Sequence, residues 1–185
     1  MLKKYGIVAM VLVVNSAFSL EVCHSFPGVL RCGKGMIDQL PDVKYGYLNL
    51  SGTTVNKLLK VDAGTFHGSH AHLNDVDVSS GSVTLKESSI EGSSIRIASG
   101  NVNFTHTDIH HDATILSPHI TVDGSHTHSI TVPSSDNGKN IRVVLQNNSV
   151  VDGNLTVGGT GAEVCVGIGS KITGKVVGAT LTHTC

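Results

Sequence analysis

The chain has 185 residues, with 13 lysines and arginines against 14 aspartates and glutamates, and 39% of its residues are hydrophobic. This length fits one modest domain, and the balanced charge gives no electrostatic argument for binding nucleic acid or an anionic membrane. The four cysteines indicate disulfides if the chain is exported.

Residues 1–19 have the pattern of a secretory signal peptide. Two lysines precede an apolar run at 7–14, and Ala17 and Ser19 supply small residues at the cleavage positions. The run is too short to span a membrane, and nothing later in the chain resembles a span. We therefore expect a mature chain that starts near Leu20 and is secreted or periplasmic, in a bacterium.

The cysteines lie in two pairs, one at each end of the mature chain. Three connectivities are open. Pairing Cys23 with Cys32 and Cys165 with Cys185 closes two short terminal loops, and each bridge would then contribute roughly 3 kcal/mol through loop entropy. Neither pair has the Cys-x-x-Cys spacing of a redox or metal site. We favour this pairing and expect the bridges to staple the chain ends.

Between these ends the sequence repeats with a period of roughly 20 residues. The clearest units are "LNLSGTTVNKLLKV" (48–61), "VTLKESSIEGSSIRI" (83–97), "VNFTHTDIHHDATIL" (102–116) and "VVLQNNSVVDGNLTV" (143–157). Weaker copies begin at Phe66, Ile120 and Val164. Each clear unit has an alternating apolar pair, then a small polar residue (Thr53, Ser88, Thr107, Asn148) and an aliphatic residue (Val55, Ile90, Ile109, Val150). Several joins are marked by glycine, at Gly46, Gly64, Gly81 and Gly100.

This pattern predicts an all-β protein, a single right-handed β-solenoid (β-helix) of about seven short coils, disulfide-stapled at both ends. The aliphatic residues should point inward and stack between coils. The small polar residues should form an inward or turn-stabilising hydrogen-bond ladder rather than a glycan-contacting one. We divide the mature chain into an N-terminal cap (20–45), solenoid coils (46–160), and a last coil with a C-terminal cap (161–185).

Three family resemblances accompany this interpretation. "SGSVTLKESSIEGSSIRIASGNVNF" resembles the repeats of filamentous-haemagglutinin-type adhesins, whose right-handed β-helices imply a binding surface; this chain is much shorter and lacks their secretion domain. "VLRCGKGMIDQLPDVKYGYLNLSGTTVNKL" resembles the N-terminal cap of leucine-rich repeat proteins, which also implies binding. "GIGSKITGKVVGATL" (167–181) resembles polymer-forming bacterial cytoskeletal solenoids, which implies end-to-end or lateral stacking into a homo-oligomer if the C-terminal cap is incomplete.

Most of the histidines gather in one part of the aligned repeat. Of eleven in the chain, seven fall between the fifth and tenth positions of their units: His70, His72, His106, His110, His111, His126 and His128. The alignment places Asp108 among them and Val151 at the position of His110 and His128. We expect Phe104 and Ile109 to point inward and the histidines to occupy turns and outward positions of one corner.

Four interpretations of this corner stay open. Imidazoles on neighbouring coils would be about one strand spacing apart, close enough to share Zn²⁺ or Cu²⁺. The expected ligands are His106, Asp108, His110, His126 and His128, with His70, His72 and His111 as further candidates. A response to acidification, catalysis, and plain solvated turn residues are the other three.

An enzyme is not the favoured interpretation. β-Helix polysaccharide lyases and hydrolases group acids in a walled groove, whereas the acids here, Asp62, Asp75, Asp77, Asp108, Asp112 and Asp123, are spread over several turns. The single long excursion is "VPSSDNGK" (132–139), and no nucleophile motif is present. We expect a binding or structural module for a host or envelope protein or glycan surface, with a compact polysaccharide-active enzyme as the alternative.

Overall fold

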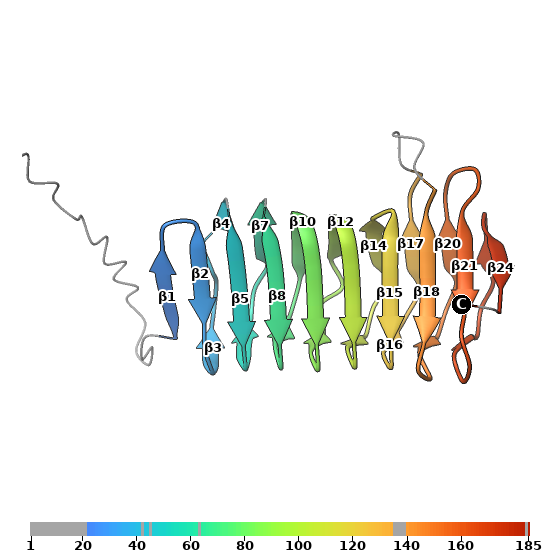
Figure 1. Ribbon diagram of the computed structural model, residues 1–185. Coiled ribbons are helices and arrows are strands. Elements are labelled where there is room, and N and C mark those ends of the chain that lie inside the picture. Colours follow the sequence, from blue (N-terminus) through green and yellow to red (C-terminus); the bar gives the residue numbers. More distant parts are fainter. Residues whose placement is uncertain (1–21, 42, 45, 63, 135–139, 184) are drawn as a thin grey trace, which may run out of the picture.

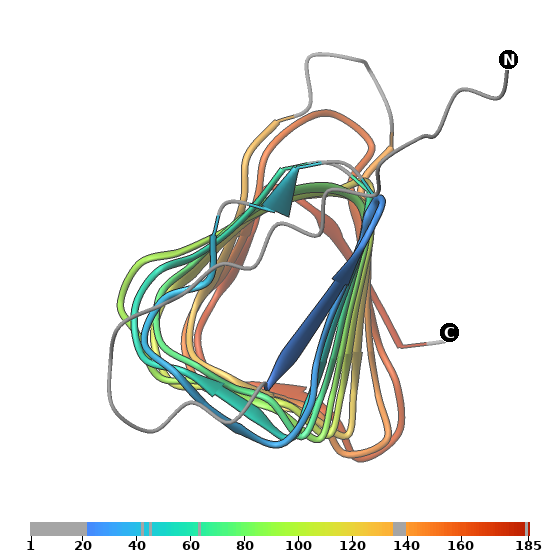
Figure 2. The ribbon, with the colours of Figure 1, turned by 90° about the vertical axis from the view of Figure 1, so that its left-hand side faces the viewer.

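The computed structural model describes residues 22–185 apart from 42, 45, 63, 135–139 and 184. The expected signal peptide and most of the excursion at 132–139 therefore lie outside the described residues. The described residues form a β-solenoid, as predicted. Their strands stand side by side along one axis, and the described residues contain no helix (Figure 1). Seen along that axis, the coils superimpose into a rounded triangle (Figure 2).

The triangle has three faces, each a stack of parallel strands. Face 1 contains β2 (Val29–Cys32), β5 (Tyr47–Ser51), β8 (Thr65–Ser69), the second halves of β10 (Val76–Lys86) and β12 (Ile95–Thr105), β15 (His119–Asp123), β18 (Arg142–Gln146), β21 (Glu163–Val166) and β24 (Thr180–Thr182). Face 2 contains β3 (Gly35–Ile37), β6 (Thr53–Val55), β9 (His72–Leu73), β11 (Ser89–Ile90), β13 (Asp108–Ile109), β16 (His126–Thr127), β19 (Val150–Val151) and β22 (Lys171–Ile172). Face 3 contains β4 (Val43–Lys44), β7 (Leu59–Asp62), the first halves of β10 and β12, β14 (Ala113–Leu116), β17 (Ile130–Val132), β20 (Leu155–Val157) and β23 (Val176–Val177).

The chain makes eight coils, because each contributes one strand to the 8-stranded sheet of face 2. The seven coils expected from the repeat are coils 2 to 8. The additional coil 1 is built from β2, β3 and β4, inside the segment assigned to the N-terminal cap. Its inward pair on face 1 is Leu30 and Cys32, in register with Leu48 and Leu50, and the repeat alignment missed it because Cys32 was assigned to the disulfide-bearing cap.

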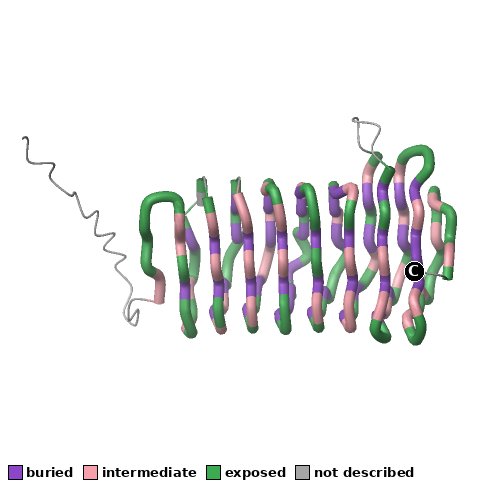
Figure 3. Tube along the Cα trace, viewed as in Figure 1, coloured by how far each residue is buried: buried purple, intermediate pink, exposed green. Residues whose placement is uncertain are grey.

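Inward side chains stack in continuous rows. On face 1 one row joins Leu48, Phe66, Val83, Val102, Ile120, Val143 and Val164, all fully or almost fully buried. The predicted inward residues Phe104 and Ile109 are likewise buried. Figure 3 shows the resulting alternation of buried and exposed positions along each strand. At roughly 1.5 to 3 kcal/mol for each fully buried large aliphatic side chain, this core is the main stabilising contribution.

The corner between faces 1 and 2 turns through a residue with positive φ in coils 2 to 7. Gly52, His70, Glu87, His106, Gly124 and Asn147 occupy this place, with φ from 48° to 64°. A left-handed backbone is uncommon for residues other than glycine and asparagine. Its recurrence at one corner shows that the coil geometry imposes it.

A ladder of buried hydroxyls supports this corner from inside. Thr53, Ser88, Thr107, Ser125 and Ser149 are at most 5% exposed, and each donates to backbone carbonyl oxygens. Three of them also accept from a backbone N–H of the preceding coil, as Ser125 Oγ does from Thr107 at 2.9 Å. The predicted inward hydrogen-bond ladder is confirmed.

Coil 7 departs from the sequence alignment by one residue. Asn147 and Asn148 both adopt positive φ, so the corner contains an extra residue. The placement of Asn148 in the ladder and Val150 in the core was therefore wrong: Asn148 is exposed, and Ser149 and Val151 take those places.

Glycines form a column at the corner between faces 3 and 1. A Cβ on Gly64, which has φ +86°, would fall on the carbonyl oxygen of Gly46, and one on Gly46 would fall on that of Gly28. The Thr65 N–H donates to Gly46 O at 2.8 Å across the same close approach. The predicted glycine-marked joins at 46 and 64 are thus places where neighbouring coils leave no room for a side chain.

Both predicted disulfides are present, Cys23–Cys32 and Cys165–Cys185. The first joins β1 (Cys23–Phe26), which runs antiparallel to β2, to that strand at a directly opposed pair. The second ties the chain end to β21. They lie near the two ends of the solenoid, as expected.

One buried hydroxyl on face 2 has no hydrogen-bond partner among the described residues, so removing it should stabilise the protein. Thr127 is fully buried between Ile109 and Val151, and its Oγ1 makes no hydrogen bond. Thr127→Val should therefore raise the unfolding free energy by about 1 kcal/mol and the Tm by a few degrees in thermal unfolding.

Thr107→Val is the matched control. It removes a hydroxyl that donates to Leu85 O and Thr105 O, both at 3.1 Å, and should lower the Tm. Equal shifts in the same direction for the two variants would contradict this account of the core.

Candidate functional site: a histidine–carboxylate surface

The predicted histidine group lies on one side of the solenoid, over the corner between faces 1 and 2 and the outer side of face 2. We call it the histidine surface: His70, His72, His106, His110, His111, His126 and His128, all exposed. His70 and His106 sit at the left-handed corner, and His72 and His126 at the starts of face 2 strands. Their side chains point outward because the intervening positions supply the core.

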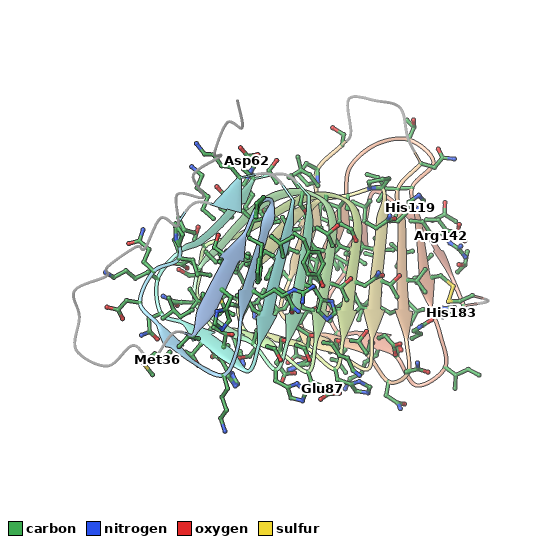
Figure 4. The ribbon with its side chains drawn as sticks, turned by 60° about the vertical axis from the view of Figure 1, so that its left-hand side comes forward. Met36, Asp62, Glu87, His119, Arg142 and His183 are labelled. Atoms are coloured by element: carbon green, nitrogen blue, oxygen red, sulfur yellow. A yellow bond between two sulfur atoms is a disulfide. The ribbon has the colours of Figure 1, made fainter. Side chains whose placement is uncertain are left out.

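Four of these histidines pair with carboxylates, and each pair joins two neighbouring coils. His70 pairs with Glu87, the residue at the same corner position one coil on. Figure 4 shows Glu87 on the outside of the solenoid at the corner between faces 1 and 2. In the second pair, His110 Nε2 lies 3.4 Å from Glu91 Oε1.

The other two pairs lie further along the axis. His126 Nε2 is 3.2 Å from Asp152 Oδ2, and His128 Nδ1 is 2.6 Å from Asp112 Oδ1. All four histidine side chains are at least half exposed. Such pairs are each worth no more than about 1 kcal/mol because water screens them.

The remaining members have other neighbours. His72 Nδ1 lies 3.0 Å from Ser89 Oγ of the next coil. The His106 ring lies over Gly124, where an added Cβ would approach the ring at 2.9 Å. Asp108 is exposed beside His126 in the strand register, and His111 is exposed in the turn after His110.

The expected metal ligands are therefore neighbours, but they do not converge. His110 and His128 hold equivalent places in coils 5 and 6, since their N–H groups donate to Ile90 O and Ile109 O in the same pattern. His110 nevertheless faces Glu91, and His128 faces Asp112. Within the described part of the chain, no three histidine, cysteine, aspartate or glutamate side chains are arranged to hold a metal ion.

The partner that sequence reasoning missed is Asp152. The alignment put Val151 beside His128, whereas the extra residue in the coil 7 corner moves Asp152 to that place, with its N–H donating to Thr127 O. Aligning Ser149 with Ser125, as small hydroxyl residues that directly precede a face 2 strand, would have revealed the shift.

The neighbours of Asp112 shift the pKa of its carboxyl group. The hydrogen bond from His128 is the largest cause that lowers its pKa below the ordinary 3.8, followed by one from Ser129. Burial acts weakly in the opposite direction. Asp112 therefore keeps its negative charge, and its contact with His128, into more acidic solution than a free aspartate would.

Most aspartates weighed for an enzyme have structural partners. Asp77 pairs with Arg96 at 3.0 Å, Asp75 accepts from the Ser94 N–H, and Asp123 accepts from Asn147. Each of these contacts links adjacent coils, as the Asp112–His128 contact does. They supply stacking interactions rather than a pair of acids facing a common groove.

Face 1 presents a second outward surface of a different kind. Its central outward row is Asn49, His67, Thr84, Asn103, Thr121 and Val144, in continuous strand register. The row that precedes it contains Tyr47, Thr65, Ser82, Asn101, His119, Arg142 and Glu163, and the row that follows it includes Lys86 and Asp123. The central row of face 1 is therefore polar from Asn49 to Thr121, and charged side chains lie in the rows on either side of it.

Comparisons with known proteins give no relative: no family model matches the sequence, and no curated protein or solved structure matches it significantly. The described residues contain no helix long and apolar enough to cross a membrane.

The His128–Asp112 pair yields a pH prediction. The folded-state pKa of Asp112 is lowered, so its ionised form should stabilise the protein above the unfolded-state value near 3.8, and this stability should disappear as pH falls through the folded-state value. In urea unfolding, the small destabilisation by Asp112→Asn should shrink over that interval. Because the pair is exposed, its size should stay below about 1 kcal/mol.

His128→Ala tests the assigned cause. Carboxyl NMR titration of this variant should show the pKa of Asp112 moving up toward the ordinary value. An unchanged Asp112 titration would mean that His128 is not responsible for the shift.

Proposed function

We propose that this protein is an exported binding or structural module that contacts a protein or glycan surface of a host or cell envelope through its lateral faces. The observation that carries the proposal is the outer side of face 1, where polar side chains (Asn49, His67, Thr84, Asn103 and Thr121) stand in continuous register over five consecutive coils. The two disulfides support export, because such bonds persist in oxidising compartments.

The spacing of face 1 suits an extended partner. Neighbouring strands lie about 4.8 Å apart along the axis, and outward residues of one strand are about 6.7 Å apart. Thr84, Asn103 and Thr121 therefore offer hydroxyl and amide groups on a regular grid. Each hydrogen bond to such a group is weak, so binding requires many of them. A flat polymer or protein surface can contact many of these groups at once.

The strand stacking also makes the grid rigid. Each outward residue alternates with buried ones, such as Val83 and Leu85 on either side of Thr84. Contacts on such a surface need little reordering of the backbone, so less conformational entropy is lost on binding.

Face 1 can be tested against face 3 with matched substitutions. Thr84→Arg with Thr121→Arg places two long cations on face 1, and Thr114→Arg with Thr156→Arg does so on face 3, where both threonines are half-buried and outward. Binding of the oxidised mature protein would be measured to arrays of glycans, cell-wall fragments and extracellular-matrix proteins. The face 1 variant should lose at least about tenfold in affinity for its ligands.

The face 3 variant should keep the affinity of the unsubstituted protein. Equal losses in both variants, or a larger loss in the face 3 variant, would contradict the assignment of face 1. Circular dichroism melts of all three proteins control for unfolding.

Transition-metal binding by the histidine surface forms the second part of the proposal. It is supported by the equivalent places of His110 and His128 in adjacent coils and by the exposure of both side chains. Rotation of the two imidazoles toward each other would bring two nitrogen ligands within reach of one Zn²⁺ or Cu²⁺. Glu91 and Asp112 would then be free to act as further oxygen ligands.

Calorimetric titration with Zn²⁺ and Cu²⁺ tests this part. Stoichiometric binding should be lost in His110→Ala with His128→Ala and retained in His67→Ala with His119→Ala, two histidines of face 1. Absence of binding, or equal binding by both variants, would remove the metal from the proposal and leave the contact function of face 1 unaffected.

A further inference from the structure

The C-terminal end of the solenoid leaves three strand edges unpaired. Among the described strands, β22, β23 and β24 each hydrogen-bond to one neighbour alone, namely β19, β20 and β21. Figure 1 shows these last strands at the right-hand end of the stack. Their outer N–H and C=O groups are arranged to accept another strand.

The core opens at the same end. A hollow of about 490 Å³ is lined on its apolar side by Val166, Ile172, Val176, Ala179 and Leu181. In the inner coils the corresponding inward positions are buried, whereas Leu181 is 45% exposed here. The last coil therefore presents apolar side chains that no described residue covers.

The N-terminal end is covered by a strand on face 1 but not on the other two faces, where β3 and β4 each pair with one described strand, β6 and β7. On face 1, β1 runs antiparallel along β2, and the Gly33 N–H donates to the Val22 carbonyl at 2.7 Å. The Val22 side chain also fills the space beside Gly35. At the C-terminal end the Cys165–Cys185 bond links Cys185 to β21, and β24 is the last strand among the described residues.

The charged side chains of the last residues are positive, although Glu163 of β21 borders β24 and accepts from the Thr182 hydroxyl at 3.3 Å. Residues 164–185 contain Lys171, Lys175 and His183 and no aspartate or glutamate. Lys171 and His183 line the hollow itself, and Figure 4 shows His183 at this end beside the disulfide. An occupant should therefore combine apolar side chains with carboxylates.

We propose that the C-terminal end is a docking surface for an extended segment of a partner protein with alternating apolar and acidic residues. The segment adds a strand to the free edge of β24, places apolar side chains over the hollow, and directs carboxylates to Lys171 and Lys175. Backbone hydrogen bonds hold such a strand, and the hollow and the lysines select its side chains. The inference is independent of the function proposed for face 1.

A second copy of this chain fits less well. Two C-terminal ends facing each other would bring lysine against lysine. The described residues of coil 1 include Arg31, Lys34 and Lys44 against Asp38, so this coil too has a positive excess. Charge complementarity therefore favours an acidic partner over self-association.

The test uses the oxidised mature protein and a capped peptide of alternating valine and glutamate, about eight residues long. Fluorescence anisotropy at low salt should show this peptide binding at least about tenfold more tightly than a valine–lysine or a serine–glutamate peptide. In NMR spectra the shifted amides should belong to β22–β24. Lys171→Glu with Lys175→Glu should reverse the preference toward the valine–lysine peptide, whereas Lys57→Glu with Lys60→Glu in coil 2 should leave it unchanged.

Three results would overturn the proposal. They are equal affinity for the acidic and basic peptides, no binding at millimolar concentration, and amide shifts confined to other coils. Concentration-dependent self-association in sedimentation experiments, abolished by the Lys171 and Lys175 substitutions, would assign the end to a second copy instead and would also refute it. Failure of these tests would not affect the experiment on face 1.

Discussion

The stacking of each coil on the next is the interaction on which the rest of this structure depends. A single coil of about 20 residues cannot bury its own inward side chains, so its stability comes from the coils above and below. Rows such as Phe66, Val83, Val102 and Ile120 meet this requirement with buried apolar residues that are in register from one strand to the next. The strand spacing of about 4.8 Å then fixes the position of every outward residue as well.

The corner between faces 1 and 2 follows from the same constraint. The chain must turn sharply there without disturbing the strand spacing, and a left-handed residue followed by an inward hydroxyl achieves this. Where the turning residue is His70, Glu87 or His106, its side chain necessarily leaves the core. The outward placement of His70 and His106 thus follows from the corner, and the carboxylate partners of four histidines add contacts between coils.

The sequence predicted the features that repeat and missed those that break the repeat. Alternating aliphatics, short polar turns and glycine joins identified the solenoid, its core and the inward hydroxyl ladder, and cysteine spacing identified both disulfides. Coil 1 was missed because Cys32, the second member of its inward pair, was assigned to the disulfide-bearing cap. The extra corner residue at Asn147–Asn148 displaced Asp152 by one place. The repeat pattern did not predict which neighbour each histidine faces. Whether an imidazole contacts another imidazole or a carboxylate depends on the rotation of its side chain, as for His110 and His128.

Terminal coils differ from internal ones because one of their sides has no neighbour. The antiparallel β1 and Val22 partly close the N-terminal side, whereas β22–β24 have neither a covering strand nor full burial of Ile172 and Val176. Stability along the axis should therefore be uneven, although the same repeat is present throughout. In a stack held together by nearest-neighbour contacts, opening should begin at the less supported end.

Amide hydrogen exchange of the protein with both disulfides formed tests this dependence on stacking most directly. The account predicts the strongest protection in the strands of coils 3 to 7, weaker protection in coil 1, and the fastest exchange in β22–β24. Equal protection in the last coil and in the central coils would show that its core and edges are covered. Protection that is low throughout would contradict the stacked core itself.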